Sequence, residues 1–176
     1  IAEAATTSVA QSLAGPIPTS WNNLDELDRL VNHELEIGRV ETAVRLLESA
    51  YPPGRASWQG VDRLSTLLLH LGEPERARKH LQAVVDVPRP ALRDVRLAVC
   101  DVVEGRHDEA RQAFRRAIEA EPGLFDAHYI LAVLEQDDGR AEAAYDQATA
   151  AVDGAPNDLA RVAAQTLAAS VRRFVH

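Results

Sequence analysis

The sequence of 176 residues has one cysteine, one lysine, no methionine and few aromatic side chains. A single thiol, Cys100, excludes an internal disulfide framework and a cysteine-based zinc cage. No apolar run approaches the roughly 20 residues that a membrane-spanning helix needs, so we expect no membrane insertion. The net charge of −8 at pH 7 has the wrong sign for a general nucleic-acid binder.

What is present is typical of a globular or repeat protein. Apolar residues make up 46% of the chain and charged residues 26%, which argues against bulk disorder. Lys79 is the one lysine among 19 basic residues, and this preference for arginine, together with the many alanines, favours a bacterial source with a GC-rich genome. The lone thiol is compatible with the cytoplasm or the periplasm, and we slightly favour the cytoplasm.

The clearest feature of the sequence is an internal repeat. A glycine, an alanine five residues after it and a leucine eight residues before it recur four times, at intervals of 33 or 34 residues. The three columns are Gly38, Gly72, Gly105 and Gly139; Ala43, Ala77, Ala110 and Ala144; and Leu30, Leu64, Leu97 and Leu131. Repeats of this length are typical of solenoid proteins.

Each repeat has the pattern of two helices joined by a short polar turn. In the third repeat the apolar residues of the expected first helix are Val95, Leu97, Ala98, Val102 and Val103, and those of the second are Ala110, Ala113, Phe114, Ala117 and Ile118. Gly105 is expected to end the first helix in a left-handed conformation, and Pro122 to follow the end of the second. No strand-like alternation occurs, so the sequence predicts an all-α fold.

This pattern resembles the tetratricopeptide repeat. The third and fourth repeats match best, through Leu97, Ala98, Gly105, Ala110, Phe114, Ala117 and Pro122, and through Leu131, Ala132, Gly139, Ala144, Ala151 and Pro156. The first two depart from the family pattern in their closing prolines and in Val31 and Ser65, where a small residue is usual. The resemblance implies a right-handed α-solenoid of four helical hairpins, over residues 24–57, 58–90, 91–124 and 125–158.

The two ends carry further helical patterns. Residues 159–176 predict an amphipathic helix, with Asp158 as its N-cap, that covers the last hairpin as a C-terminal cap. Residues 1–23 are an N-terminal segment and linker, in which residues 1–14 form either a helix docked on the array or a frayed tail.

No constellation of residues supports catalysis or a cofactor. The six histidines occupy different repeat positions without metal-ligand spacing. The cluster from Arg106 to Glu109 falls at a hairpin turn, where acidic side chains stabilise the N-terminus of the following helix. Cys100 falls within a helix and is expected to be a buried structural thiol. We therefore expect neither an enzyme nor a metal or cofactor site.

The resemblance also implies a partner-binding groove, because first helices line the concave face in this family. Four positions of each first helix project into it, and the predicted partner-binding residues at these positions are Asp62, Leu92, Val95, Val99, Val102, Asp126, Tyr129 and Val133. The lysine, asparagine and arginine clamp of the chaperone-binding members is missing. Two alternatives stay open: the apolar stripe is ordinary core, or the N-terminal segment of the chain covers it.

The sequence thus predicts a non-catalytic module that binds a peptide or helix of a partner protein. The fourth repeat carries eight acids and one arginine, and this charge would favour a partner of basic character. The alternative is a self-associating scaffold, or a helical arm of a larger protein.

Overall fold

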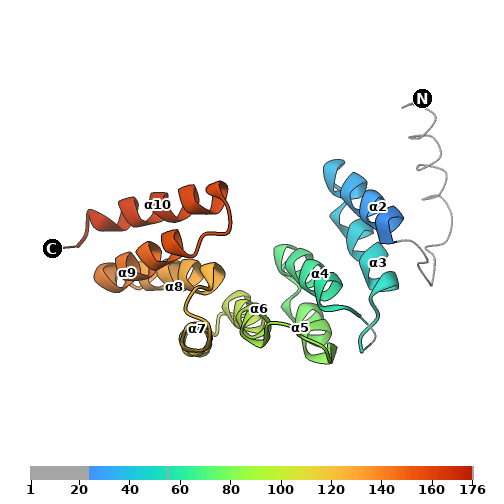
Figure 1. Cartoon of the computed structure of the whole chain (residues 1–176), viewed down its shortest axis with the longest axis horizontal. Coiled ribbons are helices and arrows are strands. Elements are labelled where there is room, and N and C mark those ends of the chain that lie inside the picture. Colours follow the sequence, from blue (N-terminus) through green and yellow to red (C-terminus); the bar gives the residue numbers. More distant parts are fainter. Residues whose placement is uncertain (1–23, 55, 176) are drawn as a thin grey trace. The chain divides into compact units, whose positions relative to one another are not determined.

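The computed structural model describes residues 24–54 and 56–175, and the regular structure within these ranges is entirely helical (Figure 1). The nine helices of the described residues are α2 (Leu24–Glu36), α3 (Val40–Ala50), α4 (Trp58–His70), α5 (Pro74–Ala83), α6 (Pro90–Val103), α7 (His107–Ala120), α8 (Phe125–Asp137), α9 (Ala141–Asp153) and α10 (Asp158–Arg172). The all-α prediction is confirmed. The predictions for residues 1–23, including a helix or tail over 1–14, lie outside the described residues.

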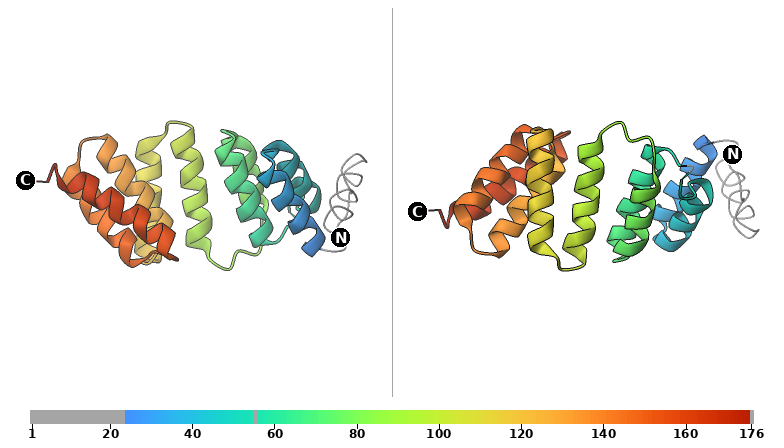
Figure 2. Two further views of the ribbon diagram at one scale, coloured as in Figure 1. Left: turned by 90° about the horizontal axis from the view of Figure 1, so that it is seen from above. Right: turned by 90° about the horizontal axis from the view of Figure 1, so that it is seen from below.

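The chain divides into two compact units, one ending at Asp86 and one beginning at Val87. The first unit contains α2 to α5 and the second contains α6 to α10. Within each unit, every helix packs against the next one along the chain, so that the helices lie side by side in sequence order (Figure 2). This is the arrangement of consecutive helical hairpins that the repeat predicts.

The repeated glycine sets the turn inside each hairpin. Gly38, Gly72, Gly105 and Gly139 all have positive φ, between 72° and 77°. At Gly105 the glycine N–H donates to the Val102 carbonyl (3.0 Å), and the next N–H, of Arg106, reaches back to the Asp101 carbonyl (2.8 Å). A residue with a Cβ would be strained in this conformation, which explains why the column contains only glycine.

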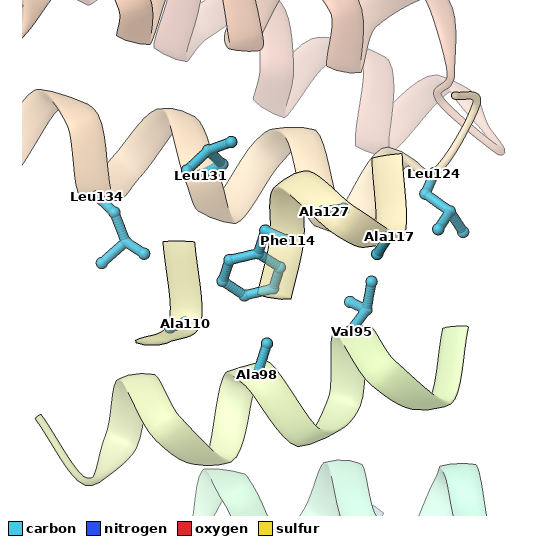
Figure 3. Close-up of a cluster of buried hydrophobic side chains, with 9 residues drawn as sticks. All are labelled: Val95, Ala98, Ala110, Phe114, Ala117, Leu124, Ala127, Leu131 and Leu134. Carbon is cyan, nitrogen blue, oxygen red and sulfur yellow. The ribbon is translucent and has the colours of Figure 1, made fainter. Parts of the chain in front are cut away.

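The core of the second unit forms around one phenylalanine. Phe114 of α7 is fully buried among side chains of α6 and α8, including Ala98 and Leu131 (Figure 3). Ala110 and Ala117 flank it on the same face of α7. Alanine above and below one large ring lets α7 approach its neighbours closely while Phe114 fills the remaining space.

The core of the first unit is built from aliphatic side chains instead. Leu27, Leu47, Leu64 and Leu68 are each fully buried there. The link between its two hairpins packs through Tyr51, whose ring lies so close to Gly60 of α4 that a Cβ there would be 2.5 Å from the ring. Glycine at the start of α4 therefore allows this tyrosine to pack against the helix.

The predicted helix over 159–176 is α10, which packs against α9 and buries Ala164 and Val171. Its N-cap is Asn157, whose side-chain oxygen accepts a hydrogen bond from Ala160 N (2.9 Å). The prediction of Asp158 as the N-cap is wrong by one residue. Asp158 lies in the first turn and forms an ion pair with Arg161 (2.8 Å). Its negative charge also interacts favourably with the positive end of the helix dipole.

Candidate partner-binding surface

The predicted site residues lie on the first helices of the hairpins, but they belong to two units. Asp62 is on α4 of the first unit, and the other seven are on α6 and α8 of the second. We call the side of α6, α8 and α10 that carries these positions the first-helix face of the second unit. Asp62 is half-buried, and its backbone carbonyl accepts hydrogen bonds from the hydroxyls of Ser65 and Thr66.

Val95 cannot contact a partner, because its side chain is 0% exposed. It packs in the core cluster with Ala98, Phe114 and Leu124 (Figure 3). The helix α6 turns this residue toward α7 and α8. Val95 is therefore a core residue, as the alternative interpretation of the apolar stripe predicts.

Three further residues of α6 lie between core and surface. Leu92, Val99 and Val102 are partly buried and pack against the same cluster. Their exposed parts extend the apolar character of the core to the surface.

The helix α8 provides a mixed surface. Tyr129 is half-buried and stacks on Phe125, with ring centroids 5.5 Å apart and planes 20° apart. Val133 lies one turn further along the helix and is also half-buried. Asp126 is paired with Arg96 of α6 (2.7 Å), so its carboxylate helps to hold two neighbouring first helices together.

Two exposed apolar residues of α10 escaped the sequence analysis. Leu159 is 81% exposed and Val162 58% exposed. Counted from the N-cap residues, they take the second and fifth places of α10, as Asp126 and Tyr129 do in α8. A repeat interval of 33 residues between α8 and α10 aligns these positions, and the same interval separates Gly72 from Gly105.

The corresponding face of the first unit is polar and internally paired. Arg63 of α4 donates to Asp28 Oδ1 (2.6 Å) and to Asn32 Oδ1 (2.6 Å), both on α2. Burial raises the pKa of the nearby Tyr51 hydroxyl, and the charge of Asp28 adds to this shift while Arg63 opposes it. Arg63 therefore partly neutralises the acidic side chains on this face of the first unit.

The ion pairs between first helices are made by arginines that share one repeat position, and the sequence analysis did not identify this arginine column. Arg29, Arg63 and Arg96 each stand nine residues before the repeat glycine, and the fourth repeat has Ile130 there. Arg63 and Arg96 each bind an acid on a neighbouring first helix of their own unit. The same periodicity that revealed the glycines would have found this column.

The described residues contain no group of three His, Cys, Asp or Glu side chains that could hold a metal ion. Cys100 is fully buried, as expected, and its thiol donates to the Arg96 carbonyl (3.4 Å). Among the described helices, none has both the length and the apolar character required to span a membrane.

Comparison with solved structures identifies the fold as that of tetratricopeptide-repeat proteins. One similar structure is YrrB, described as "a TPR protein with an unusual peptide-binding site": the TM-score is 0.55 and the identity 20%, over 93% of this chain and 86% of YrrB. Another is MamA from Desulfovibrio magneticus RS-1, with a TM-score of 0.55 and 17% identity, over 88% of this chain and 96% of that one. A further MamA structure has a TM-score of 0.53 and 18% identity, over 82% of this chain and 94% of MamA.

At these identities the structural matches define the fold alone. No protein-family model matches the sequence, and no curated protein is significantly similar to it.

Proposed function

We propose that this protein is a non-catalytic interaction module that binds a peptide or helix of a partner protein on the first-helix face of its second unit. The observation that carries the proposal is the pair of exposed apolar residues on α10, Leu159 and Val162, at the repeat positions of Asp126 and Tyr129 on α8. Large apolar side chains exposed near one another are typical of binding surfaces.

The chemistry of this face suggests how a ligand is held. Tyr129 offers a flat ring with a polar hydroxyl, a residue type that is enriched at binding surfaces. Leu159 and Val162 would each contribute on the order of 1.5–3 kcal/mol if a ligand buried them fully, although binding entropy offsets much of this gain. Exposed acidic residues of the fourth repeat, such as Asp137, favour a ligand with basic residues beside its apolar ones.

The proposal is tested by selecting peptides from a displayed library on the full chain and measuring their affinity for variants. Leu159→Asp combined with Val162→Asp should weaken binding at least tenfold, because two apolar contacts become charged. Both positions are exposed, so circular dichroism should stay unchanged. The matched control is Val85→Asp in the first unit, where the side chain is 87% exposed and the affinity should not change.

Unchanged affinity in the α10 double variant, or a selection that enriches no peptide, would refute the proposal. Self-association is the second candidate, because the same exposed side chains could be covered by another copy of the chain. Light scattering separates the two: a dimer that Leu159→Asp and Val162→Asp dissociate would support self-association in place of peptide binding.

A further inference from the structure

A groove of about 590 Å³ lies between α9 and α10, outside the first-helix face. Its walls are Tyr145, Thr149, Val152 and Asp153 of α9, and Gln165, Ala168, Ala169, Arg172 and Arg173 at and after the end of α10. Its middle is formed by alanines and Val152, and its two ends are charged. The groove lies wholly within the second unit.

The preceding hairpin shows what occupies the equivalent place. One side of α8 carries His128, Ala132 and Glu135, all buried by the helix that follows, α9. His128 Nδ1 lies 2.8 Å from Gln147 Oε1 of α9, and Arg140, the N-cap residue of α9, binds the Glu135 carboxylate. On this side of α8, the groove is therefore filled by a helix.

The same side of α10 has no helix on it in the described part of the chain. Counted from the N-caps, Arg161, Gln165 and Ala168 take the places of His128, Ala132 and Glu135. Gln165 is exposed and Ala168 is half-buried, in contrast to the full burial of their counterparts on α8. The groove is thus the place that a further second helix would occupy.

The charge at this place differs from that on α8, because Ala168 takes the place of Glu135 and supplies no carboxylate. On α8 the carboxylate of Glu135 forms ion pairs with Arg140 and with Arg115, and the distance from Arg115 Nη2 to Glu135 Oε1 is 3.0 Å. Arg172 and Arg173, which correspond to Gly139 and Arg140, line the same end of the α9–α10 groove, where no lining residue is a carboxylate among the described residues. An occupant with an arginine at its start, as α9 has, would be repelled there, whereas one with a carboxylate would be attracted.

We infer that the α9–α10 groove is a second docking site, which takes a partner protein's amphipathic helix with small residues along one face and a carboxylate in its first turn. Small residues are required because α9 presents Ala144, Ala148 and Ala151, all fully buried, in the equivalent packing. The carboxylate would meet Arg172 and Arg173, and it would also interact favourably with the positive end of its own helix dipole.

The chain itself provides the probe for this inference. A synthetic peptide of residues 139–153 is the helix that fills the equivalent groove on α8, and the Arg140→Glu version of this peptide has the charge that the α10 groove requires. Fluorescence anisotropy with the full chain should show the Glu peptide binding roughly three- to tenfold tighter than the Arg peptide, as expected for exposed charge pairs.

Variants of the protein locate the binding. Arg172→Glu with Arg173→Glu should reverse the preference, so that the unchanged Arg140 peptide binds tighter. Ala168→Phe should fill the groove and lower the affinity for both peptides at least tenfold. If Ala168→Phe folds poorly, Thr149→Trp should have the same effect, because it fills the groove from the exposed surface of α9. Arg116→Glu, an exposed change on α7, is the matched control and should alter neither affinity.

Several results would overturn the inference. They are binding of neither peptide, equal affinity for both, a preference that does not reverse in the Arg172→Glu, Arg173→Glu variant, or undiminished binding by both groove-filling variants. A dimer that Thr149→Trp dissociates would assign the groove to a second copy of the chain instead. The Leu159→Asp, Val162→Asp variant should retain peptide binding here, so this site can fail independently of the first-helix face.

Discussion

The carboxylates of Glu34 and Glu135 occupy the same repeat position in the two units, four residues before the glycine, and both residues are 1% exposed. Glu135 is bound by Arg115 from the preceding helix and by Arg140 from the following one. Within the described residues, both carboxylate oxygens of Glu34 lack a hydrogen-bond partner. The buried carboxylate of Glu135 thus links neighbouring helices, whereas the carboxylate of Glu34 lowers the stability of the first unit through its uncompensated desolvation.

A second position differs between the units in burial. Asp62 and Val95 both stand ten residues before the glycine, yet Asp62 is partly exposed on α4 and Val95 is fully buried on α6. The repeat fixes where a helix begins and ends, and neighbouring helices decide which of its faces is covered. Equivalent positions therefore have different environments, and substitutions at them should have different effects.

The largest expected effect is that of Val95→Asp. It places a charge without a partner in the core around Phe114, which should cost several kcal/mol and unfold the second unit. Both tryptophans of the sequence, Trp21 and Trp58, precede Asp86, so tryptophan fluorescence reports on the first unit and circular dichroism on both. We expect a large loss of helical signal, with a fluorescence transition that persists.

The matched control is Asp62→Val, which gives the first unit the residue that the second has at this position. Because Asp62 is partly exposed, the free energy of unfolding of the first unit should change by less than about 0.5 kcal/mol. A Val95→Asp protein with native helicity would show that this residue is accessible after all.

The fold was predictable because its signals are local and repeated. Four glycines at one spacing define four turns, and the apolar residues between them have helical periodicity. The confirmed predictions are the all-α fold, the hairpins and the left-handed glycines, such as Gly105.

The site was predictable only in part, because exposure depends on contacts that a repeat position does not specify. Val95 matched a surface position of the family and is core. Leu159 and Val162 were left out of the predicted site, because residues 159–176 were interpreted as a capping helix and not as a further repeat helix. The pairing of Asp126 with Arg96 required the distance between two helices, which no sequence pattern showed.

A single substitution made at two equivalent positions sharpens the comparison of carboxylates. Glu34→Leu should stabilise the first unit by about 1–3 kcal/mol, because an unpartnered buried carboxylate is replaced by an apolar side chain. Leucine fits this position, since Leu68 occupies it on α4 and is fully buried. Glu135→Leu should destabilise the second unit by about 1–3 kcal/mol through the loss of its two arginine contacts. Urea denaturation followed by fluorescence and circular dichroism measures both changes, and equal signs for the two variants would contradict the difference in pairing.

The smallest expected effect is a pH dependence confined to the first unit. His80 of α5 is almost completely buried, and its Nε2 lies 3.5 Å from Glu48 Oε1. Its Nδ1 has no hydrogen-bond partner in the described part of the chain. Burial lowers the pKa of His80, and the positive charges of Lys79 and Arg76 add to this shift while Glu48 opposes it.

Because the pKa of His80 is lower in the folded than in the unfolded chain, the unfolded chain takes up the proton first as the pH falls. The first unit should therefore keep its full stability above the unfolded value of about 6.5 and lose stability progressively below it, until the folded pKa is passed. The urea midpoint followed by tryptophan fluorescence should fall between pH 7.5 and pH 5.5, and His80→Gln should reduce this fall. The control His70→Gln changes an exposed histidine at the end of α4 and should leave the fall intact. A fall that is the same in His80→Gln as in the unchanged protein would show that another group carries the pH dependence.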